Sequence, residues 1–359
     1  MSRPAIHQLS VSAAYGDAIG NEVMQIRDAL RAAGYDSDVF VELVDPRMAA
    51  EVRPYTEYGE VSSPDNIVVL HYSIGSRVSE LARAIGDKLV LIYHNITPAH
   101  WYAPYTFTVA RDCAAGRLEL ASLKERTALG LGDSEYNRLE LEELGFAPTG
   151  VLPLLLDLSA LDGTPDPTVM ARYDDDRPAW LFVGRVVPNK CFEDIVRAFA
   201  YFQRYVNHRA RLVIVGEHRT FSPYYDALQQ MAANLGVDGV HFTGHVTNSE
   251  LRAYYDVADA FVCMSEHEGF CVPLFEAIYK DLPVFAFDAA AIPYSTDGGV
   301  MLFESKDPAL VAETIAATMA DDGIRAALLK RQRAALASVD PGAVLSTLMG
   351  HLTALTAPA

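Results

Sequence analysis

Short apolar runs rich in β-branched residues recur along the whole chain, separated by longer stretches with helical spacing. This alternation is typical of βαβ units, in which parallel strands are buried between helices. It constrains the fold strongly, because each parallel strand needs a crossover segment before the next one. We therefore expect an α/β protein built from doubly wound sheets.

The runs fall into two series, and each series predicts six strands. The expected strands are 6–11, 39–43, 67–71, 89–94, 129–133 and 150–156, then 180–183, 212–215, 240–243, 260–265, 284–287 and 300–303. The clearest expected helix is 21–33, where apolar residues recur at helical spacing and Gly34 closes the end.

Length and composition favour two domains. The chain has 359 residues, of which 50% are hydrophobic and 21% charged, enough apolar material for two cores. Residues 161–178 are rich in Pro and Asp and predict a linker between domains 1–160 and 179–340, and 341–359 predict a helix that packs back on the first lobe. Two Rossmann-like lobes in sequence predict an interdomain cleft, since open α/β sheets bind ligands at the carboxyl ends of their strands.

The formal charge of -18 disfavours nucleic acid as a partner, because phosphate contacts need clustered Lys and Arg. Four cysteines lie without metal-ligand or disulfide spacing, which fits a reducing cytoplasm. The sequence has neither a signal-peptide layout nor a window of 18 apolar residues. We expect a cytoplasmic protein, or one peripheral at the inner membrane face.

A Gly-Arg-x-x-x-x-Lys segment directly follows the expected strand 180–183. Its Gly184, Arg185 and Lys190 would lie at the carboxyl end of that strand. Arg offers a planar fork and Lys a compact point charge, and the two suit a diphosphate in an acidic protein. Two ordinary surface cations at a turn are the alternative.

A second segment follows the expected strand 260–265. Pro273 suits the start of a helix, which would put the Gly269 and Phe270 amides at its positive end, where phosphate oxygens bind. Glu268 and Glu276 flank these amides, and carboxylates there suit sugar and ribose hydroxyls. Glu276 is equally well explained as a partner of the helix dipole.

Two weaker signals accompany these segments. Arg219 follows the expected strand 212–215 and would be either a second cation or a solvated side chain. Gly16 and Gly20 lie in the loop after the first expected strand, where they form a weak nucleotide fingerprint.

Together these residues resemble the second lobe of the retaining GT-B fold glycosyltransferases of family four. That family carries two glutamates with seven residues between them, as Glu268 and Glu276 stand here, and a matching Gly-Arg…Lys segment. Segments 70–75, 93–98 and 133–137 are similar to first-lobe segments of a bacterial polysaccharide-assembly branch. The family usually has a pair of glycines in the first loop, whereas Gly16 and Gly20 are separated here, and Cys271 replaces a common glycine.

The resemblance implies a role for each matched residue. Arg185 and Lys190 would stabilise the departing diphosphate, Glu276 would hold the ribose, Glu268 would contact the transferred sugar, and His94 would lie beside that sugar in the cleft.

The expected function is the retaining transfer of a hexose from a nucleotide-diphosphate sugar to a glycan or lipid-linked saccharide. GDP-mannose is preferred slightly over UDP-sugars. No cofactor or metal is expected, because Arg185 and Lys190 stand where a metal would neutralise the diphosphate, and the acidic run 174–176 precedes a strand instead of following one. A hydrolysing sugar-nucleotide epimerase, a phosphorylase and a non-catalytic sugar-nucleotide-binding scaffold are the alternatives. The sequence leaves the oligomeric state open.

Overall fold

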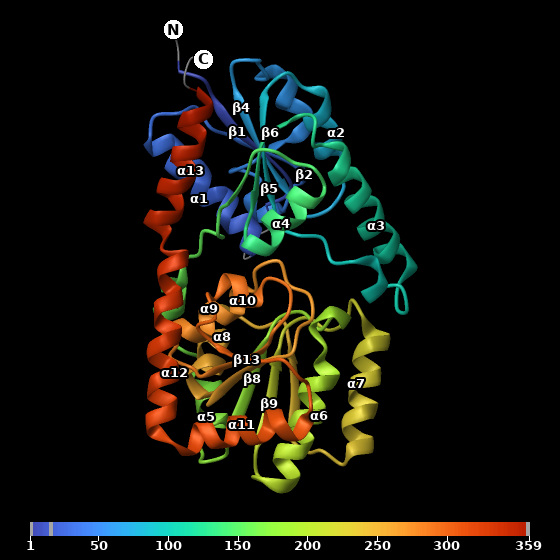
Figure 1. Cartoon of the computed structure of the whole chain (residues 1–359), viewed down its shortest axis with the longest axis vertical. Helices are drawn as coiled ribbons and strands as arrows, with labels where there is room; N and C mark the ends of the chain where they lie inside the picture. Colours follow the sequence, from blue (N-terminus) through green and yellow to red (C-terminus); the bar gives the residue numbers. More distant parts are fainter. Residues whose placement is uncertain (1–2, 14–16, 357–359) are drawn as a thin grey trace. The chain divides into compact units, whose positions relative to one another are not determined.

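The computed structural model describes residues 3–13 and 17–356 and divides the chain into two compact units (Figure 1). The first unit comprises Met1–Ala103, Phe107–Leu156 and Ser338–Ala359, and the second comprises Pro104–Thr106 and Asp157–Ala337. Within the described residues, no helix is both long and apolar enough to cross a membrane.

The first unit contains a seven-stranded parallel sheet in the order β3-β2-β1-β4-β5-β6-β7. Its strands are β1 (Ile6–Ser12), β2 (Val39–Leu43), β3 (Arg53–Pro54), β4 (Ile67–Tyr72), β5 (Lys88–Tyr93), β6 (Thr127–Gly132) and β7 (Thr149–Val151). Its helices are α1 (Ala18–Ala32), α2 (Arg77–Ala84), α3 (Phe107–Ser122), α4 (Glu135–Glu143) and α13 (Pro341–Thr356).

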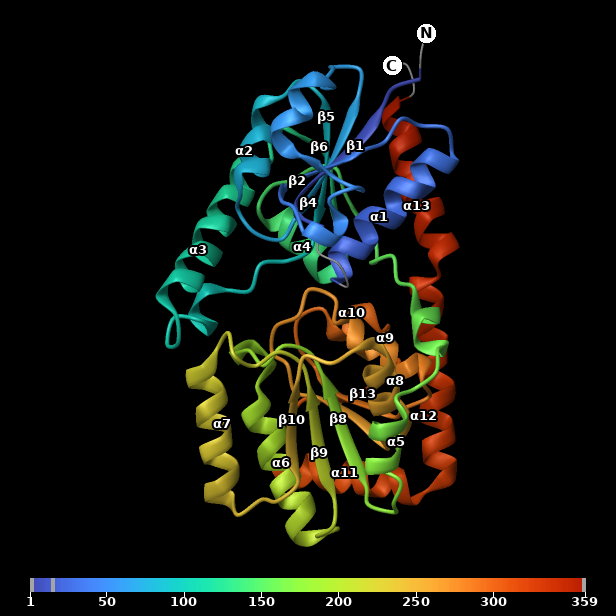
Figure 2. The same cartoon turned by 180° about the vertical axis from the view of Figure 1, so that it is seen from behind.

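The second unit contains a six-stranded parallel sheet in the order β10-β9-β8-β11-β12-β13. Its strands are β8 (Ala179–Val183), β9 (Arg211–Val215), β10 (Val240–Gly244), β11 (Ala260–Cys263), β12 (Val284–Phe287) and β13 (Met301–Phe303). Its helices are α5 (Pro167–Arg172), α6 (Phe192–Tyr205), α7 (Ser222–Leu235), α8 (Asn248–Val257), α9 (Val272–Tyr279), α10 (Ile292–Ser295), α11 (Pro308–Ala320) and α12 (Asp322–Ala335) (Figure 2).

Both sheets have the doubly wound order, which confirms the predicted fold class. Counted within each unit, the first six strands follow the order 3-2-1-4-5-6, with the order reversing between β1 and β4 and between β8 and β11. In such sheets ligands bind beside this reversal, at the carboxyl ends of the strands. The strand order therefore picks out one position in each unit where a binding site is expected.

The last helix completes the core of the first unit. Val344, Leu348 and Leu352 of α13 are buried in one cluster with Ile26 and Leu30 of α1 and with apolar residues of the strands. The Lys88 ammonium also donates to the Leu355 carbonyl at 2.8 Å. Although α13 closes the sequence, its apolar stripe thus covers the sheet built from the first 151 residues.

Each predicted strand overlaps an observed one, and the differences have local causes. The expected strand 150–156 ends at Val151, because Pro153 cannot donate to a ladder. Helix α1 begins at Ala18, three residues before the expected start, because the Asp17 carboxylate accepts from the Gly20 amide and caps it there.

The segment 161–178, expected as a linker, lies in the second unit. It carries α5, which starts at Pro167 behind a capping residue, Asp166, whose carboxylate accepts from the Thr168 and Val169 amides at 2.9 Å. Proline, read in the sequence as a loop signal, occupies the first turn of this helix, where its missing N–H costs nothing.

Four buried polar side chains lie close together in the first unit, near the strand reversal of its sheet. Glu22 of α1, His71 of β4, His94 after β5 and Asp133 after β6 each have side chains no more than 2% exposed. His94 Nε2 lies 3.6 Å from Glu22 Oε2, and His94 Nδ1 lies 3.6 Å from Asp133 Oδ2. The imidazole of His94 is therefore held between two carboxyl groups.

The hydrogen bonds of Gln8 assign the protons in this cluster. Gln8 Nε2 donates to the Val23 carbonyl at 3.0 Å, so Gln8 Oε1 is an acceptor and His71 Nε2, 2.9 Å away, carries a hydrogen. His71 Nδ1 then accepts from His94 Nε2 at 3.0 Å. The two ring planes are 6° apart with centroids 5.3 Å apart, so the rings meet edge to edge, a geometry that suits a shared proton.

Burial and charge shift the pKa values of this cluster. Burial raises the pKa of Glu22 to about 7, although the neighbouring His94 charge and the Leu155 amide oppose this. Burial lowers the pKa of His94, but the Asp133 and Glu22 carboxylates outweigh it and the net shift is upward. Both groups therefore hold protons more tightly in the folded chain than in the unfolded one.

We predict that Glu22 makes the stability of the first unit depend on pH. Between its ordinary pKa of 4.5 and about 7, the unfolded chain releases this proton while the folded chain keeps it, so stability falls as pH rises. Glu22→Gln keeps an oxygen for the Leu155 amide, 3.3 Å from Glu22 Oε1, but does not titrate. Relative to the native chain, its free energy of unfolding should rise between about pH 5 and pH 8, by up to about 3 kcal/mol.

Urea unfolding at each pH measures this difference. Glu143→Gln, at an exposed position on α4, is the control. Its free energy of unfolding should equal that of the native chain at both ends of this pH range. Equal pH slopes for the native chain and Glu22→Gln would contradict the prediction.

Candidate active site

The carboxyl ends of β8 and β11, adjacent strands at the reversal of the second sheet, carry the two main segments singled out in the sequence. Gly184 follows β8 directly, with φ at +148°, and Gly216 follows β9, with φ at +147°. A Cβ on Gly216 would collide with the Gly184 carbonyl. Glycine is therefore required where these two strands end.

Backbone hydrogen bonds continue the pairing past these glycines. The Gly184 amide donates to the Val215 carbonyl at 2.8 Å, and the Val186 amide donates to the Glu217 carbonyl at 2.8 Å. The backbone of Arg185, between them, is thereby held at the carboxyl edge of the sheet. Its side chain is exposed and forms no ion pair with the described residues.

Asn189 ties the segment after β8 to the segment after β11. Its Nδ2 donates to the His267 carbonyl at 2.8 Å, and its own carbonyl accepts from the Glu266 amide at 3.0 Å. These bonds bring Lys190 and Glu268 together, and Lys190 Nζ donates to Glu268 Oε1 at 2.7 Å. Because the side chains are only 13% and 11% exposed, this ion pair is shielded from solvent.

The ion pair keeps Lys190 charged. Burial alone would lower the pKa of Lys190, but the Glu268 carboxylate outweighs it and the net shift is upward. An ammonium has three hydrogens, of which Glu268 takes one. A shielded cation with donors to spare suits an anionic oxygen, while the same site offers Glu268 to hydroxyl groups.

Helix α9 begins beside this pair. Cys271, the residue before α9, has φ at +71° in the left-handed region, where glycine is favoured over other residues. This conformation explains why a glycine is common at the matching position of the resembled family. Phe270 is buried and stacks on Phe275 with ring centroids 5.0 Å apart, which anchors the start of α9 in the core.

Glu276 in α9 is oriented by a residue that the sequence analysis missed. The phenol of Tyr255, in α8, donates to Glu276 Oε2 at 2.6 Å. Burial raises the pKa of Glu276, and the Tyr255 hydrogen bond only partly offsets this. Tyr255 lies 21 residues before Glu276 on another helix, and no local pattern distinguishes it from Tyr254, the other aromatic residue of α8.

The loop after β9 is organised by Glu217. Its carboxylate accepts from the Thr220 amide at 3.0 Å and from the Thr220 hydroxyl at 2.8 Å. It also accepts from the Arg219 amide. The Arg219 side chain is exposed and is in no ion pair with the described residues.

Two groups of potential metal ligands lie near this site: Cys263 with Glu268 and Cys271, and Cys191 with Asp194 and Glu266. Each group already contacts a lysine ammonium. Lys190 binds Glu268, as described, and Lys306 Nζ donates to Asp194 Oδ2 at 2.9 Å and to Glu266 Oε1 at 2.6 Å. Lysine side chains therefore supply positive charge to both groups.

The candidate residues divide between the two units. Gly184, Arg185, Lys190, Glu268, Gly269, Phe270 and Glu276 follow β8 or β11, and Arg219 follows the neighbouring strand β9. His94 lies in the first unit, inside the buried polar cluster. Gly16 falls outside the described residues.

Comparison with known proteins finds a family match in the second unit. Residues 171–335 match the family model described as glycosyl transferases group 1. A GDP-mannose-dependent alpha-(1-6)-phosphatidylinositol monomannoside mannosyltransferase of Mycobacterium tuberculosis is 34% identical over 142 residues, covering 36% of each chain. A D-inositol 3-phosphate glycosyltransferase of Corynebacterium efficiens is 31% identical over 148 residues, covering 40% of this chain and 35% of that one. The chain thus spans little more than a third of the length of these relatives.

Solved structures resemble the chain over nearly its whole length. Sucrose-phosphate synthase from Thermosynechococcus elongatus has a TM-score of 0.76 at 18% identity, with 98% of this chain and 99% of that one covered. HepE from Anabaena, in complex with UDP and glucose, has a TM-score of 0.74 at 16% identity, with 98% and 100% covered. The chain therefore has the GT-B fold, and residues 171–335 of its second unit match the group 1 glycosyl transferases.

Proposed function

We propose that the chain is a retaining glycosyltransferase that moves a hexose from a nucleotide-diphosphate sugar to a glycan or a lipid-linked saccharide. The observation that carries the proposal is the shielded Lys190–Glu268 pair at the carboxyl ends of β8 and β11. A cation suited to phosphate beside a carboxylate suited to sugar hydroxyls supports the proposal. The family match of the second unit supports the same activity.

In the proposed reaction, the bond between the anomeric carbon and the diphosphate oxygen breaks as the bond to the acceptor oxygen forms. Negative charge grows on the departing diphosphate, and cations already in place stabilise it. Lys190 and Arg185 supply these cations, and the first turn of α9 adds the positive end of a helix dipole. The acceptor proton passes to the leaving phosphate oxygen.

Retention is proposed from the resemblance to the retaining glycosyltransferases of family four, and Glu268 is poorly suited to act as a nucleophile in a two-step route to it. Its carboxylate is bound to Lys190, which lowers its reactivity towards carbon. Same-face attack, in which the acceptor enters on the side that the diphosphate leaves, needs no protein nucleophile. Glu268 is then free to orient sugar hydroxyls.

GDP-mannose is the proposed donor, ahead of UDP-sugars. Relatives of the matched region are named as GDP-mannose-dependent mannosyltransferases, while some solved structures of this fold hold UDP. Thermal shifts with GDP-mannose, GDP, UDP-glucose and UDP test the preference, because a ligand at 100 times its Kd stabilises by about 2.7 kcal/mol. Labelled donor with and without acceptors separates transfer from epimerisation, phosphorolysis and binding alone.

Transfer should not need a divalent ion, since Lys190 and Arg185 supply the positive charge. Initial rates measured with the purified chain should therefore be unchanged by excess EDTA. A loss of activity that magnesium or manganese restores would contradict this.

Glu276→Gln should weaken donor use without unfolding the chain. The amide keeps an oxygen for the Tyr255 phenol but loses the charge that would hold ribose hydroxyls. We expect kcat/KM to fall by an amount worth roughly 1.5 to 3 kcal/mol, with the melting temperature unchanged. Tyr255→Phe should lower kcat/KM by less, because it removes the hydrogen bond that orients the Glu276 carboxylate but keeps the carboxylate itself.

A native kcat/KM in Glu276→Gln would contradict the prediction. Glu276 would then interact with the helix dipole and not with the donor. Kinetics with the donor as the varied substrate, together with melting curves of the same preparations, provide the measurement.

Arg185→Ala should act on turnover more than on donor affinity. Charge on the departing phosphate rises as the bond breaks, so a cation aimed there helps the transition state more than the bound donor. We expect kcat to fall by about 10² to 10³ while the donor Kd rises less. Arg185→Lys should recover part of the activity, since a point charge replaces a two-pronged contact.

Arg197→Ala, at an exposed position on α6, is the matched control and should keep the native kcat. Single-turnover rates at saturating donor separate binding from chemistry. If Arg185→Ala turned over at the native rate, Arg185 would be a surface cation and the leaving-group assignment would be wrong.

A further inference from the structure

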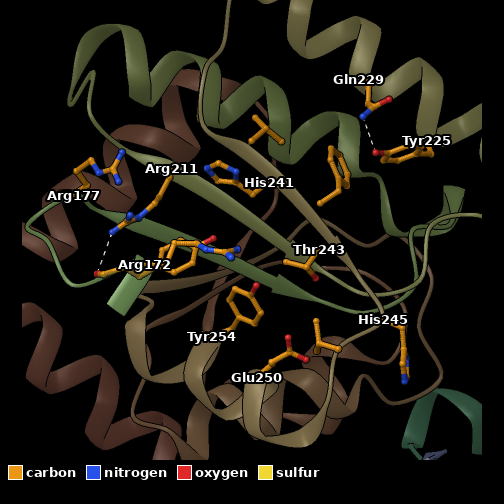
Figure 3. A pocket seen from close by; sticks show the side chains of 14 residues that line it. Arg172, Arg177, Arg211, Tyr225, Gln229, His241, Thr243, His245, Glu250 and Tyr254 are labelled. Atoms are coloured by element: carbon orange, nitrogen blue, oxygen red, sulfur yellow. Dashed lines mark hydrogen bonds between the residues drawn. The ribbon is translucent and has the colours of Figure 1, made fainter. Parts of the chain in front are cut away.

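A pocket of about 630 Å³ lies along the free edge of the second sheet, beside β10 (Figure 3). Strand β10 is the edge strand of this sheet and pairs with β9, and Tyr225 of α7 and Tyr254 of α8 line the pocket beside it. In Figure 3 three arginines and His241 gather at one end of the pocket, while His245 lies at the other. The pocket is thus polar and charged at one end and aromatic along its length.

The arginine end lies far from the candidate active site of the same unit. Arg211 is the first residue of β9, whereas Gly216 follows the last. Because parallel strands run in one direction, the arginines lie at the amino ends of the strands, and Lys190 lies at the carboxyl ends. A ligand at the arginine end would therefore occupy a separate site.

Arg211 is the buried member of this group. Its side chain is 3% exposed, and its guanidinium lies over the Tyr173 ring, 4.5 Å from the centroid. Its Nη2 donates to Asp175 Oδ1 at 2.6 Å, but its Nε is buried without a hydrogen-bond partner among the described residues. A buried guanidinium with an unused donor is costly unless a ligand or solvent oxygen completes it.

Among the residues that line the pocket, the three arginines outnumber the acidic residues, of which Glu250 is the one example. Arg177 and Arg211 share one carboxylate, Asp175, which lies 2.8 Å and 2.6 Å from their nitrogens, and Arg172 is in no ion pair with the described residues. Asp176 is paired elsewhere, with Arg209. In a chain with a net charge of -18, such a local excess of guanidinium groups indicates a site for an anion.

The remaining charged groups support this assignment. Burial lowers the pKa of His241, and the three neighbouring arginines lower it further, so the ring is a neutral hydrogen-bonding group near pH 7. Glu250, the acidic residue that lines the pocket, is occupied in capping α8, where it accepts from the Thr247 amide at 2.7 Å. It does not neutralise the arginines.

We propose that this pocket is a second ligand site, which takes the phosphate ester of a small molecule. Arg172, Arg177 and Arg211 bind the phosphate, because guanidinium groups match phosphate oxygens in geometry and charge. The organic part lies against the rings of Tyr173 and Tyr254. The volume falls within the range of small-molecule sites, about 300 to 1,000 Å³. This inference does not rest on the proposed transfer reaction.

Calorimetric titration of the full chain with phenyl phosphate and with inorganic phosphate tests the site. Phenyl phosphate should bind more tightly than inorganic phosphate, because the tyrosine rings contact the ester group. Lys190→Ala should bind phenyl phosphate as the native chain does, since Lys190 belongs to the other site. The double variant Arg172→Gln, Arg177→Gln should bind at least tenfold more weakly.

The double variant Arg197→Gln, Arg204→Gln removes the same charge from exposed positions of α6 and should bind as the native chain does. Arg172→Gln alone breaks no ion pair of the described residues, so its weaker binding remains informative if the double variant unfolds. Phenyl phosphate that does not bind, that binds equally to the Arg172 variants, or that loses affinity only in Lys190→Ala would overturn the proposal.

Discussion

The reversal of strand order between β8 and β11 is the constraint on which the candidate active site depends. The two strands are neighbours, but in a doubly wound sheet the segments that follow them turn to opposite faces, so their loops diverge. The ion pair of Lys190 and Glu268 links the two loops. Asn189 also holds them together, with one hydrogen bond from its side chain and one to its carbonyl. A cation and a carboxylate are thereby placed where an open sheet binds its ligand.

Under the proposed function, an acidic chain has to bind an anionic ligand with few cations. With a net charge of -18, the chain as a whole repels a diphosphate, so attraction has to be local. Lys190 is shielded and paired, whereas Arg185 is exposed and in no ion pair with the described residues. One cation is thus held in position before a ligand arrives, while the other can adjust to it.

The sequence predicted strand positions well, because buried parallel strands leave a continuous apolar run that short windows detect. Backbone crowding requires glycine at 216 and a positive φ favours it at 184, and the sequence shows both glycines directly. Individual side-chain contacts between helices could not be predicted. Tyr255 reaches Glu276 only through the packing of α8 near α9, and the short strand β3 has two residues, too few for any pattern.

The buried cluster of the first unit shows the same limit more clearly. His71 and His94 lie in segments that the sequence singled out, but their proton arrangement follows from Gln8, whose amide is fixed by the Val23 carbonyl. No spacing rule connects Gln8 with a histidine 63 residues later. Only the parallel register of β1 and β4 brings them together.

The central claim is that Lys190 and Glu268 mark the site of a diphosphate. Calorimetric affinities of GDP and GMP for the native chain and for the double variant Lys190→Met, Glu268→Gln test it most directly. The double variant removes both charges together, so it leaves neither one buried alone. The account predicts that GDP binds the native chain at least tenfold more tightly than GMP and that this ratio falls towards one in the variant. An unchanged ratio in a folded variant would contradict the account.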